Sequence, residues 1–200
     1  SGQSTPLCQG LCRGGTTGAG SVSANCPVVC EARTYCPSGS PEPVQCPPGY
    51  FCASRASEAP SGPCPSRCFC AAGTSDPLST LCPPGRYGSG QGLLNSSCSG
   101  ECDAGYWCPS GSLSPRQHAC GAASVYCPAG SFEPSVAPPG TFTIGTSEQT
   151  RLSFVDCPPG SECTIGLASL CRPGRYSNRT GLSTCTRCAP GRFASNENST

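Results

Sequence analysis

The chain of 200 residues carries a formal net charge of +1 and contains 21 cysteines, 26 glycines and 23 prolines. Leucine, isoleucine, valine and phenylalanine together number only 26, too few to bury the apolar area that one large packed core requires. This composition excludes a Rossmann domain, a barrel and a helical bundle, and the near-neutral charge argues against a disordered chain. A small disulfide-rich fold is the class that remains.

The cysteines favour disulfides over metal binding. Zinc modules use Cys-x2-Cys pairs supported by histidine, whereas here that pair occurs once, at Cys185 and Cys188, and the only histidine is His118. Disulfides at this density persist in oxidising compartments. We therefore expect an extracellular or cell-surface protein without a metal or a cofactor.

Two similar blocks of cysteines occupy the first two thirds of the chain. In both blocks an aromatic residue precedes the third cysteine and Pro-Ser-Gly-Ser follows it. Fixed spacing over two copies indicates an internal duplication. It predicts one cysteine-rich repeat group at 1–81 and a second at 82–131. The first block is Cys26, Cys30, Cys36, Cys46 and Cys52, and it recurs as Cys98, Cys102, Cys108, Cys120 and Cys127.

A shorter motif, Cys-x-Pro/Ala-Gly-x-aromatic, runs through both blocks and beyond them. Proline fixes φ and glycine permits a positive φ, so the motif predicts a tight turn directly after a bridged cysteine. The aromatic residue is expected to cover the disulfide. Copies begin at Cys46, Cys82, Cys102, Cys171 and Cys188 and, without the aromatic residue, at Cys157.

With these motifs the sequence resembles the ephrin-receptor-type cysteine-rich repeat and, more distantly, EGF-like and tumour-necrosis-factor-receptor-like modules. Tyr50-Phe51-Cys52 and the stretch 126–131 are similar to long arrays of this repeat in large surface proteins of algae and other protists. Mastigoneme proteins, which coat flagella as hair-like filaments, are one such group. Outside roughly 132–156, the resemblance implies an extracellular rod of tandem short β-hairpins and loops, with little or no helix and no catalytic residues.

Residues 132–156 contain no cysteine. The stretches 141–144 and 151–155 are strand-like and 145–150 connects them, which predicts a small β-hairpin. Such a hairpin needs a packing surface and would suit contact with an adjacent subunit; the alternative is a linker between repeat groups. The remainder, 157–200, is expected to be a third cysteine-rich group, truncated at its C-terminus.

Disulfide connectivity cannot be deduced from sequence, but loop length favours four pairs. Cys82 fits either Cys98 or Cys70. The odd number of cysteines leaves one without a partner, and we expect this to be Cys188, whose motif reaches Thr200 without a closing cysteine, as in a segment cut from a longer array. The four favoured pairs are Cys12–Cys26, Cys36–Cys46, Cys108–Cys120 and Cys171–Cys185.

Three Asn-x-Ser/Thr sequons predict N-glycosylation in a secreted chain. They begin at Asn95, Asn178 and Asn198. Four Pro-Pro-Gly triplets and many Ser and Thr residues, together with the resemblance to algal-type surface proteins, suggest O-glycans on Ser/Thr or on hydroxyproline.

The sequence offers no catalytic constellation. A Ser-His-Asp or Cys-His site needs a histidine, and His118 stands in a turn-like loop; the 11 acidic residues are scattered. There is no basic stripe for nucleic acid and no apolar run of about 20 residues for direct membrane insertion. We expect a protein that is not an enzyme.

Three roles remain. The first is a structural segment that builds a glycosylated surface filament, stalk or coat through self-assembly or contact with other surface proteins. The second is the ligand-binding ectodomain of a receptor. The third, less favoured, is a serine-protease inhibitor that presents an exposed arginine such as Arg86 or Arg175.

Overall fold

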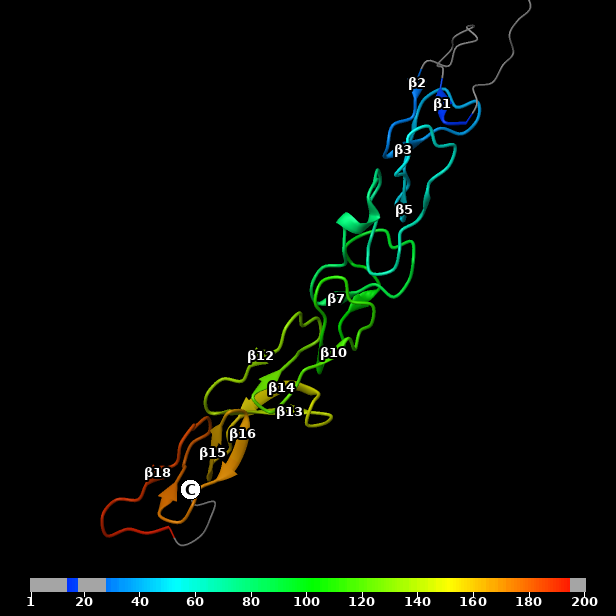
Figure 1. The fold of residues 1–200 in the computed structure, drawn as a ribbon. Coiled ribbons are helices and arrows are strands. Elements are labelled where there is room, and N and C mark those ends of the chain that lie inside the picture. The colour runs from blue at the N-terminus through cyan, green and yellow to red at the C-terminus, as the bar shows by residue number, and fades with distance from the viewer. Residues whose placement is uncertain (1–13, 18–27, 195–200) are drawn as a thin grey trace, which may run out of the picture. The chain divides into compact units, whose positions relative to one another are not determined.

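The computed structural model describes residues 14–17 and 28–194. In this part of the chain the structure consists of nine two-stranded antiparallel sheets and one short 3-10 helix, η1 (Pro77–Ser79) (Figure 1). The expected class, a small disulfide-rich chain of short β-hairpins, is confirmed.

Most strands have two residues, which is the length that fits between a turn and the next cysteine. The first nine are β1 (Thr16–Thr17), β2 (Val28–Val29), β3 (Thr34–Tyr35), β4 (Val44–Gln45), β5 (Tyr50–Phe51), β6 (Gly62–Pro63), β7 (Arg86–Tyr87), β8 (Gly100–Glu101) and β9 (Tyr106–Trp107). The others are β10 (His118–Ala119), β11 (Val125–Tyr126), β12 (Ser135–Val136), β13 (Thr141–Gly145), β14 (Arg151–Asp156), β15 (Ser161–Thr164), β16 (Leu167–Leu170), β17 (Arg175–Tyr176) and β18 (Thr186–Arg187).

The described chain divides into two compact units. Among the described residues, the N-terminal unit comprises 14–17, 28–82 and 88–99, and the C-terminal unit comprises 83–87 and 100–194. The four groups expected from the sequence, 1–81, 82–131, 132–156 and 157–200, stay a prediction.

The Cys-x-Pro-Gly motif forms the turn that its residues predict. The N–H of Tyr50 donates to the carbonyl of Pro47 at 3.2 Å, and Gly49 has φ +83°. A proline followed by a residue at positive φ is typical of a type II turn, and glycine is favoured at the second of these positions. The chain then enters β5 and reaches Cys52. We call the segment from a first cysteine to the cysteine that follows its turn and strand a turn repeat.

Six of the eight disulfides among the described residues close within one turn repeat. Their Cα atoms are 5.6 to 6.1 Å apart, which suits an unforced bridge. The six pairs are Cys30–Cys36, Cys46–Cys52, Cys64–Cys70, Cys102–Cys108, Cys120–Cys127 and Cys157–Cys163.

The expected pairs Cys36–Cys46 and Cys108–Cys120 are therefore wrong. The register Tyr35↔Val44 and Thr34↔Gln45 shows why, because Cys36 follows one end of the hairpin and Cys46 follows the other. The second pair fails in the same way: the register of β9 and β10 puts Cys108 and Cys120 at opposite ends. Loop length alone cannot reveal this offset.

Two turn repeats lack the second cysteine and recruit a distant one. Gly88 stands in the last position of the repeat that begins at Cys82, and Cys82 pairs with Cys98. The fully buried Ser177 stands in the same position after Cys171, which pairs with Cys185. Cys171–Cys185 and Cys82–Cys98 agree with the loop-length expectation, while Cys70 is taken by Cys64. The expected pair Cys12–Cys26 lies outside the described residues.

Backbone hydrogen bonds join each turn repeat to the next within both units. In the N-terminal unit the N–H of Cys64 donates to the carbonyl of Gly49 at 2.7 Å, and the N–H of Gly49 donates to the carbonyl of Cys70 at 2.8 Å. In the C-terminal unit Cys171 and Gly160 are joined in the same manner at 2.9 Å. The backbone N–H and carbonyl groups of each turn thus form hydrogen bonds with the backbone of the next turn repeat.

The core of the described chain is made of cysteine. Every buried apolar residue is a cysteine except Ala137, and seventeen large hydrophobic side chains remain exposed. Cys64, Cys68 and Cys70 form a cluster with the half-buried Phe51 against it. Disulfides therefore fill the position that an aliphatic core occupies in larger domains.

The cysteine-free stretch is a hairpin, as one of the two readings expected. Strand β13 pairs with β14 with an irregularity between Ile144 and Gly145. The hairpin lies beside β15–β16 (Figure 1). The cysteine-free stretch 132–156 also contains a turn repeat that has no disulfide. Ala137 and Thr143 take its two cysteine positions, and the N–H of Ala137 donates to the carbonyl of Ser124 at 2.9 Å.

Candidate functional site: sequons, free thiols and surface hollows

The first sequon lies on an exposed loop that a long-range disulfide closes. Asn95 is exposed and belongs to the loop between Cys82 and Cys98. Its Oδ1 accepts a hydrogen bond from the N–H of Ser97 at 3.0 Å. This is an Asx-turn, which holds the amide side chain against the hydroxyl-bearing residue of the sequon. Asn95 is thus presented in an accessible geometry.

The second sequon occupies the equivalent kind of loop in the C-terminal unit. Asn178 is exposed and follows Ser177, whose hydroxyl donates to the carbonyl of Arg179 at 3.1 Å. Cys171–Cys185 closes this loop. Both described sequons therefore lie in the loops that the two long-range disulfides close. The third, at Asn198, lies outside the described residues.

Two described cysteines are free, Cys68 and Cys188. Cys188 was expected to be unpaired, but sequence analysis missed Cys68. Cys68 is fully buried beside the Cys64–Cys70 bridge, and this burial raises the pKa of its thiol; the Arg67 cation lowers it by less and the Asp76 carboxylate adds to the rise. The available signal was its position, since Cys68 stands where Tyr50 stands in the preceding turn repeat.

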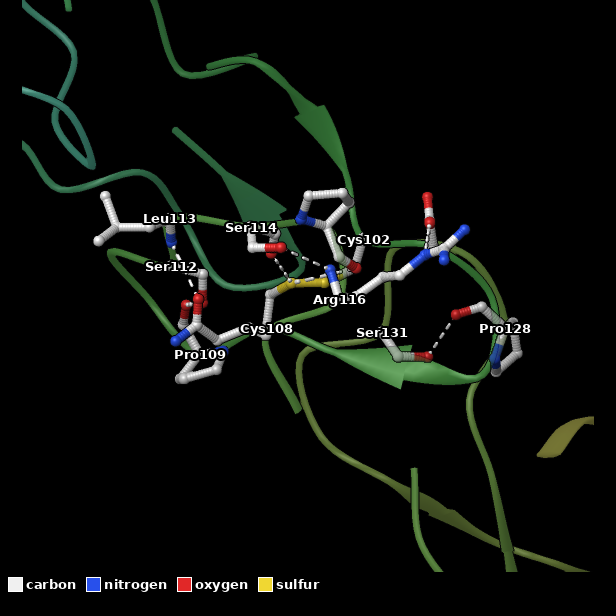
Figure 2. The surroundings of a disulfide bond; sticks show 12 residues. Cys102, Cys108, Pro109, Ser112, Leu113, Ser114, Arg116, Pro128 and Ser131 are labelled. Atoms are coloured by element: carbon white, nitrogen blue, oxygen red, sulfur yellow. Dashed lines mark hydrogen bonds and ion pairs between the residues drawn. A yellow bond between two sulfur atoms is a disulfide. The ribbon is translucent and has the colours of Figure 1, made fainter. Parts of the chain in front are cut away.

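The Cys102–Cys108 bridge shows how the loops protect a disulfide (Figure 2). The Sγ of Cys108 lies 3.4 Å from the carbonyl oxygen of Ser114. The N–H of Arg116 donates to the Ser114 hydroxyl at 3.2 Å, and its Nε donates to Asp103 at 2.7 Å. This hydrogen bond and the charge of Asp103 raise the pKa of the Arg116 guanidinium. The loop is thereby held over the sulfur atoms.

His118 is positioned by packing across a hairpin. Its ring stacks on Trp107 with centroids 4.6 Å apart, and the two residues are paired across β9 and β10. Trp107, which directly precedes the bridged Cys108, therefore packs on the residue that it faces on strand β10.

Both arginines considered for an inhibitory loop are engaged on short strands. Arg86 forms an ion pair with Glu101 at 2.9 Å. The Nη1 of Arg175 donates to the carbonyl of Cys185 at 2.8 Å. Neither projects from a freely protruding loop.

Two hollows formed by described residues lie on the surface of the C-terminal unit. The larger, about 530 Å³, is lined by three alanines and a glycine together with Glu148, Gln149, Arg151 and Leu167. The smaller, about 290 Å³, is almost wholly apolar and includes Val136 and Ile165. Within the part of the chain that the structure describes, no group of three or more His, Cys, Asp or Glu residues is arranged to hold a metal ion.

No helix among the described residues is long and apolar enough to cross a membrane. A search of protein-family models matches nothing in this chain, and a search of curated proteins finds no match.

Proposed function

We propose that this protein is a non-catalytic structural segment of a glycosylated extracellular filament, stalk or coat. The observation that carries the proposal is the repetition of one hydrogen-bonded turn repeat within each unit, closed by its own disulfide. Nearest-neighbour repetition of this kind is how solenoid proteins extend along one direction. We expect a series of short bridged turns to resist bending and proteolysis.

Glycosylation supports the same role. Asn95 and Asn178 are exposed and could carry N-glycans, which are bulky and solubilising. Mastigoneme-like surface proteins, which the sequence resembles, give the proposal its class. The proposed partners are further copies of the chain or other surface proteins.

Electron microscopy of native surface material tests this role. With an antibody against the chain, we expect label along regular filaments or a continuous coat. Label confined to dispersed monomers at high concentration would contradict the proposal. Treatment with a peptide N-glycosidase should convert Asn95 and Asn178 to aspartate in the mapped peptides, and unmodified asparagine at both sites would remove the glycan part.

A receptor ectodomain is the second candidate. The hollow beside Glu148, Gln149 and Arg151 is the observation that favours it, since its volume lies within the range of small-ligand sites. Glycan-array binding that Arg151→Ala abolishes would support this role. The inhibitor alternative ranks behind both because Arg86 and Arg175 are held by partners; unchanged trypsin activity at equimolar protein would remove it.

A further inference from the structure

The tip of the β15–β16 hairpin carries an isoleucine that local preference disfavours. Ile165 has φ +54° and Gly166 has φ +71°, and Thr164 pairs with Leu167 on either side. This is a two-residue loop of type I′, for which Asn-Gly is the preferred sequence. A β-branched residue at positive φ is a genuine outlier, and its backbone is strained.

The loop tip is held through its backbone, because the carbonyl of Gly166 accepts from the N–H of Thr143 at 3.0 Å, and the Ile165 side chain adds little. The Ile165 side chain is 73% exposed, so folding buries little of its apolar surface. Asparagine at this position would remove the strain and expose a polar side chain instead. The isoleucine therefore serves something other than the stability of its own hairpin.

An apolar groove lies directly beside Ile165. Its volume is about 290 Å³, several times the roughly 30 Å³ that one water occupies in the liquid, so it has room for an aliphatic side chain. Val136, 76% exposed, forms part of its wall. None of the lining residues carries a charge; they are Ser124, Val136, Ala137, Pro139, Cys163, Thr164, Ile165 and Ser183.

The uncharged lining of the groove determines which kind of side chain can bind there. A charged peptide would leave its ionised groups without partners here, and burying an unpaired charge is costly. An uncharged aliphatic side chain fits, and the same patch exposes one, that of Ile165. An interface with two-fold symmetry requires one patch that carries both a projection and the hollow that receives it. Ile165 and the groove meet this requirement side by side.

We propose that this patch is a self-complementary docking surface for a second copy of the chain. Ile165 of each copy enters the groove beside Val136 of the other. The inference deepens the proposed assembly role and rests on it for its biological meaning. The patch is smaller than the roughly 800 Å² per partner of a standard interface, so the pairing is weak, with a dissociation constant in the micromolar range or above.

Static light scattering on the full, oxidised and glycosylated chain tests the pairing. Across a concentration series from about 10 μM to 1 mM, the apparent mass of the natural chain should rise toward twice its value at high dilution. Ile165→Asn should stay monomeric over the whole series, and its melting temperature should rise because the strain is removed. Val136→Asn should also stay monomeric, without that rise.

Leu78→Asn provides the matched control. Leu78 is 66% exposed and lies in the N-terminal unit, so its replacement should leave the concentration dependence unchanged. A natural chain that stays monomeric to the highest concentration overturns the proposal, and so does Ile165→Asn that pairs like the natural chain. If microscopy shows labelled filaments but light scattering shows only monomers, this contact is rejected and the assembly role stands. If light scattering shows pairs but microscopy shows no filaments, the assembly role is rejected and the contact stands.

Discussion

The glycine of each turn repeat is held by both backbone conformation and space. Gly49 has φ +83°, and a methyl group there would lie 2.7 Å from the carbonyl oxygen of Gly92. We expect Gly49→Ala to lower the free energy of unfolding by about 2 kcal/mol or more. Gly90→Ala is the control, because nothing lies within 4 Å of its added carbon. Thermal unfolding of the oxidised proteins measures both, and an equal effect at the two sites would contradict the account.

The two free thiols should differ in reactivity at the residue scale. Burial raises the pKa of Cys68, so at pH 8 less of it is the reactive thiolate, and the reagent cannot reach it. Cys188 is half-buried. Iodoacetamide at pH 8 followed by peptide mass spectrometry should modify Cys188 in the folded protein and Cys68 only in denaturant. Modification of folded Cys68 as fast as Cys188 would show that the site is open.

At the scale of the element, the turn repeat tolerates loss of its disulfide where other contacts replace it. Ala137 and Thr143 occupy the two cysteine positions, and the Thr143 hydroxyl donates to the carbonyl of Ala123 at 2.7 Å. The double variant Ala137→Cys/Thr143→Cys should form a bridge. Closing so short a loop is worth about 2 kcal/mol, offset by roughly 1 kcal/mol for the lost hydrogen bond.

Intact mass spectrometry and thermal unfolding check this element. The oxidised double variant should be two hydrogens lighter than the mass calculated for its sequence with the natural bridges alone, and it should melt above the natural chain. Thr143→Cys alone should melt below it. Two cysteines at 137 and 143 that both stay alkylatable under oxidising conditions would show that this segment does not adopt the geometry of a turn repeat.

The sequence predicts the class of element but not its pairing. Turn chemistry at Pro47-Pro48-Gly49 is local, so the turn could be read directly. Hairpin register depends on which residues face one another across the two strands, and strands of two residues carry little pattern that would reveal it. Loop length therefore predicted the pair Cys36–Cys46, which the observed register excludes. The free Cys68 and the hidden repeat at Ala137 are not apparent from the sequence because both break the regular spacing of the cysteines. The strained Ile165 is visible only in backbone angles.

At the scale of the whole molecule, disulfides take the part of a hydrophobic core. Buried apolar residues of the described chain are cysteines apart from Ala137. Complete reduction should therefore unfold the protein at neutral pH, with loss of amide dispersion in a nitrogen–proton correlation spectrum. A spectrum that stays dispersed after every bridge is reduced would show that packing and hydrogen bonds suffice.

The disulfide map tests the central claim most directly, which is that a turn repeat with cysteines at both of its ends closes on itself. Proteolysis of the non-reduced protein, with mass spectrometry of the linked peptides, should recover Cys46 bound to Cys52, Cys64 bound to Cys70 and Cys157 bound to Cys163. The long-loop pairs Cys82–Cys98 and Cys171–Cys185 should accompany them. Peptides that join Cys36 to Cys46, or Cys108 to Cys120, would contradict the account.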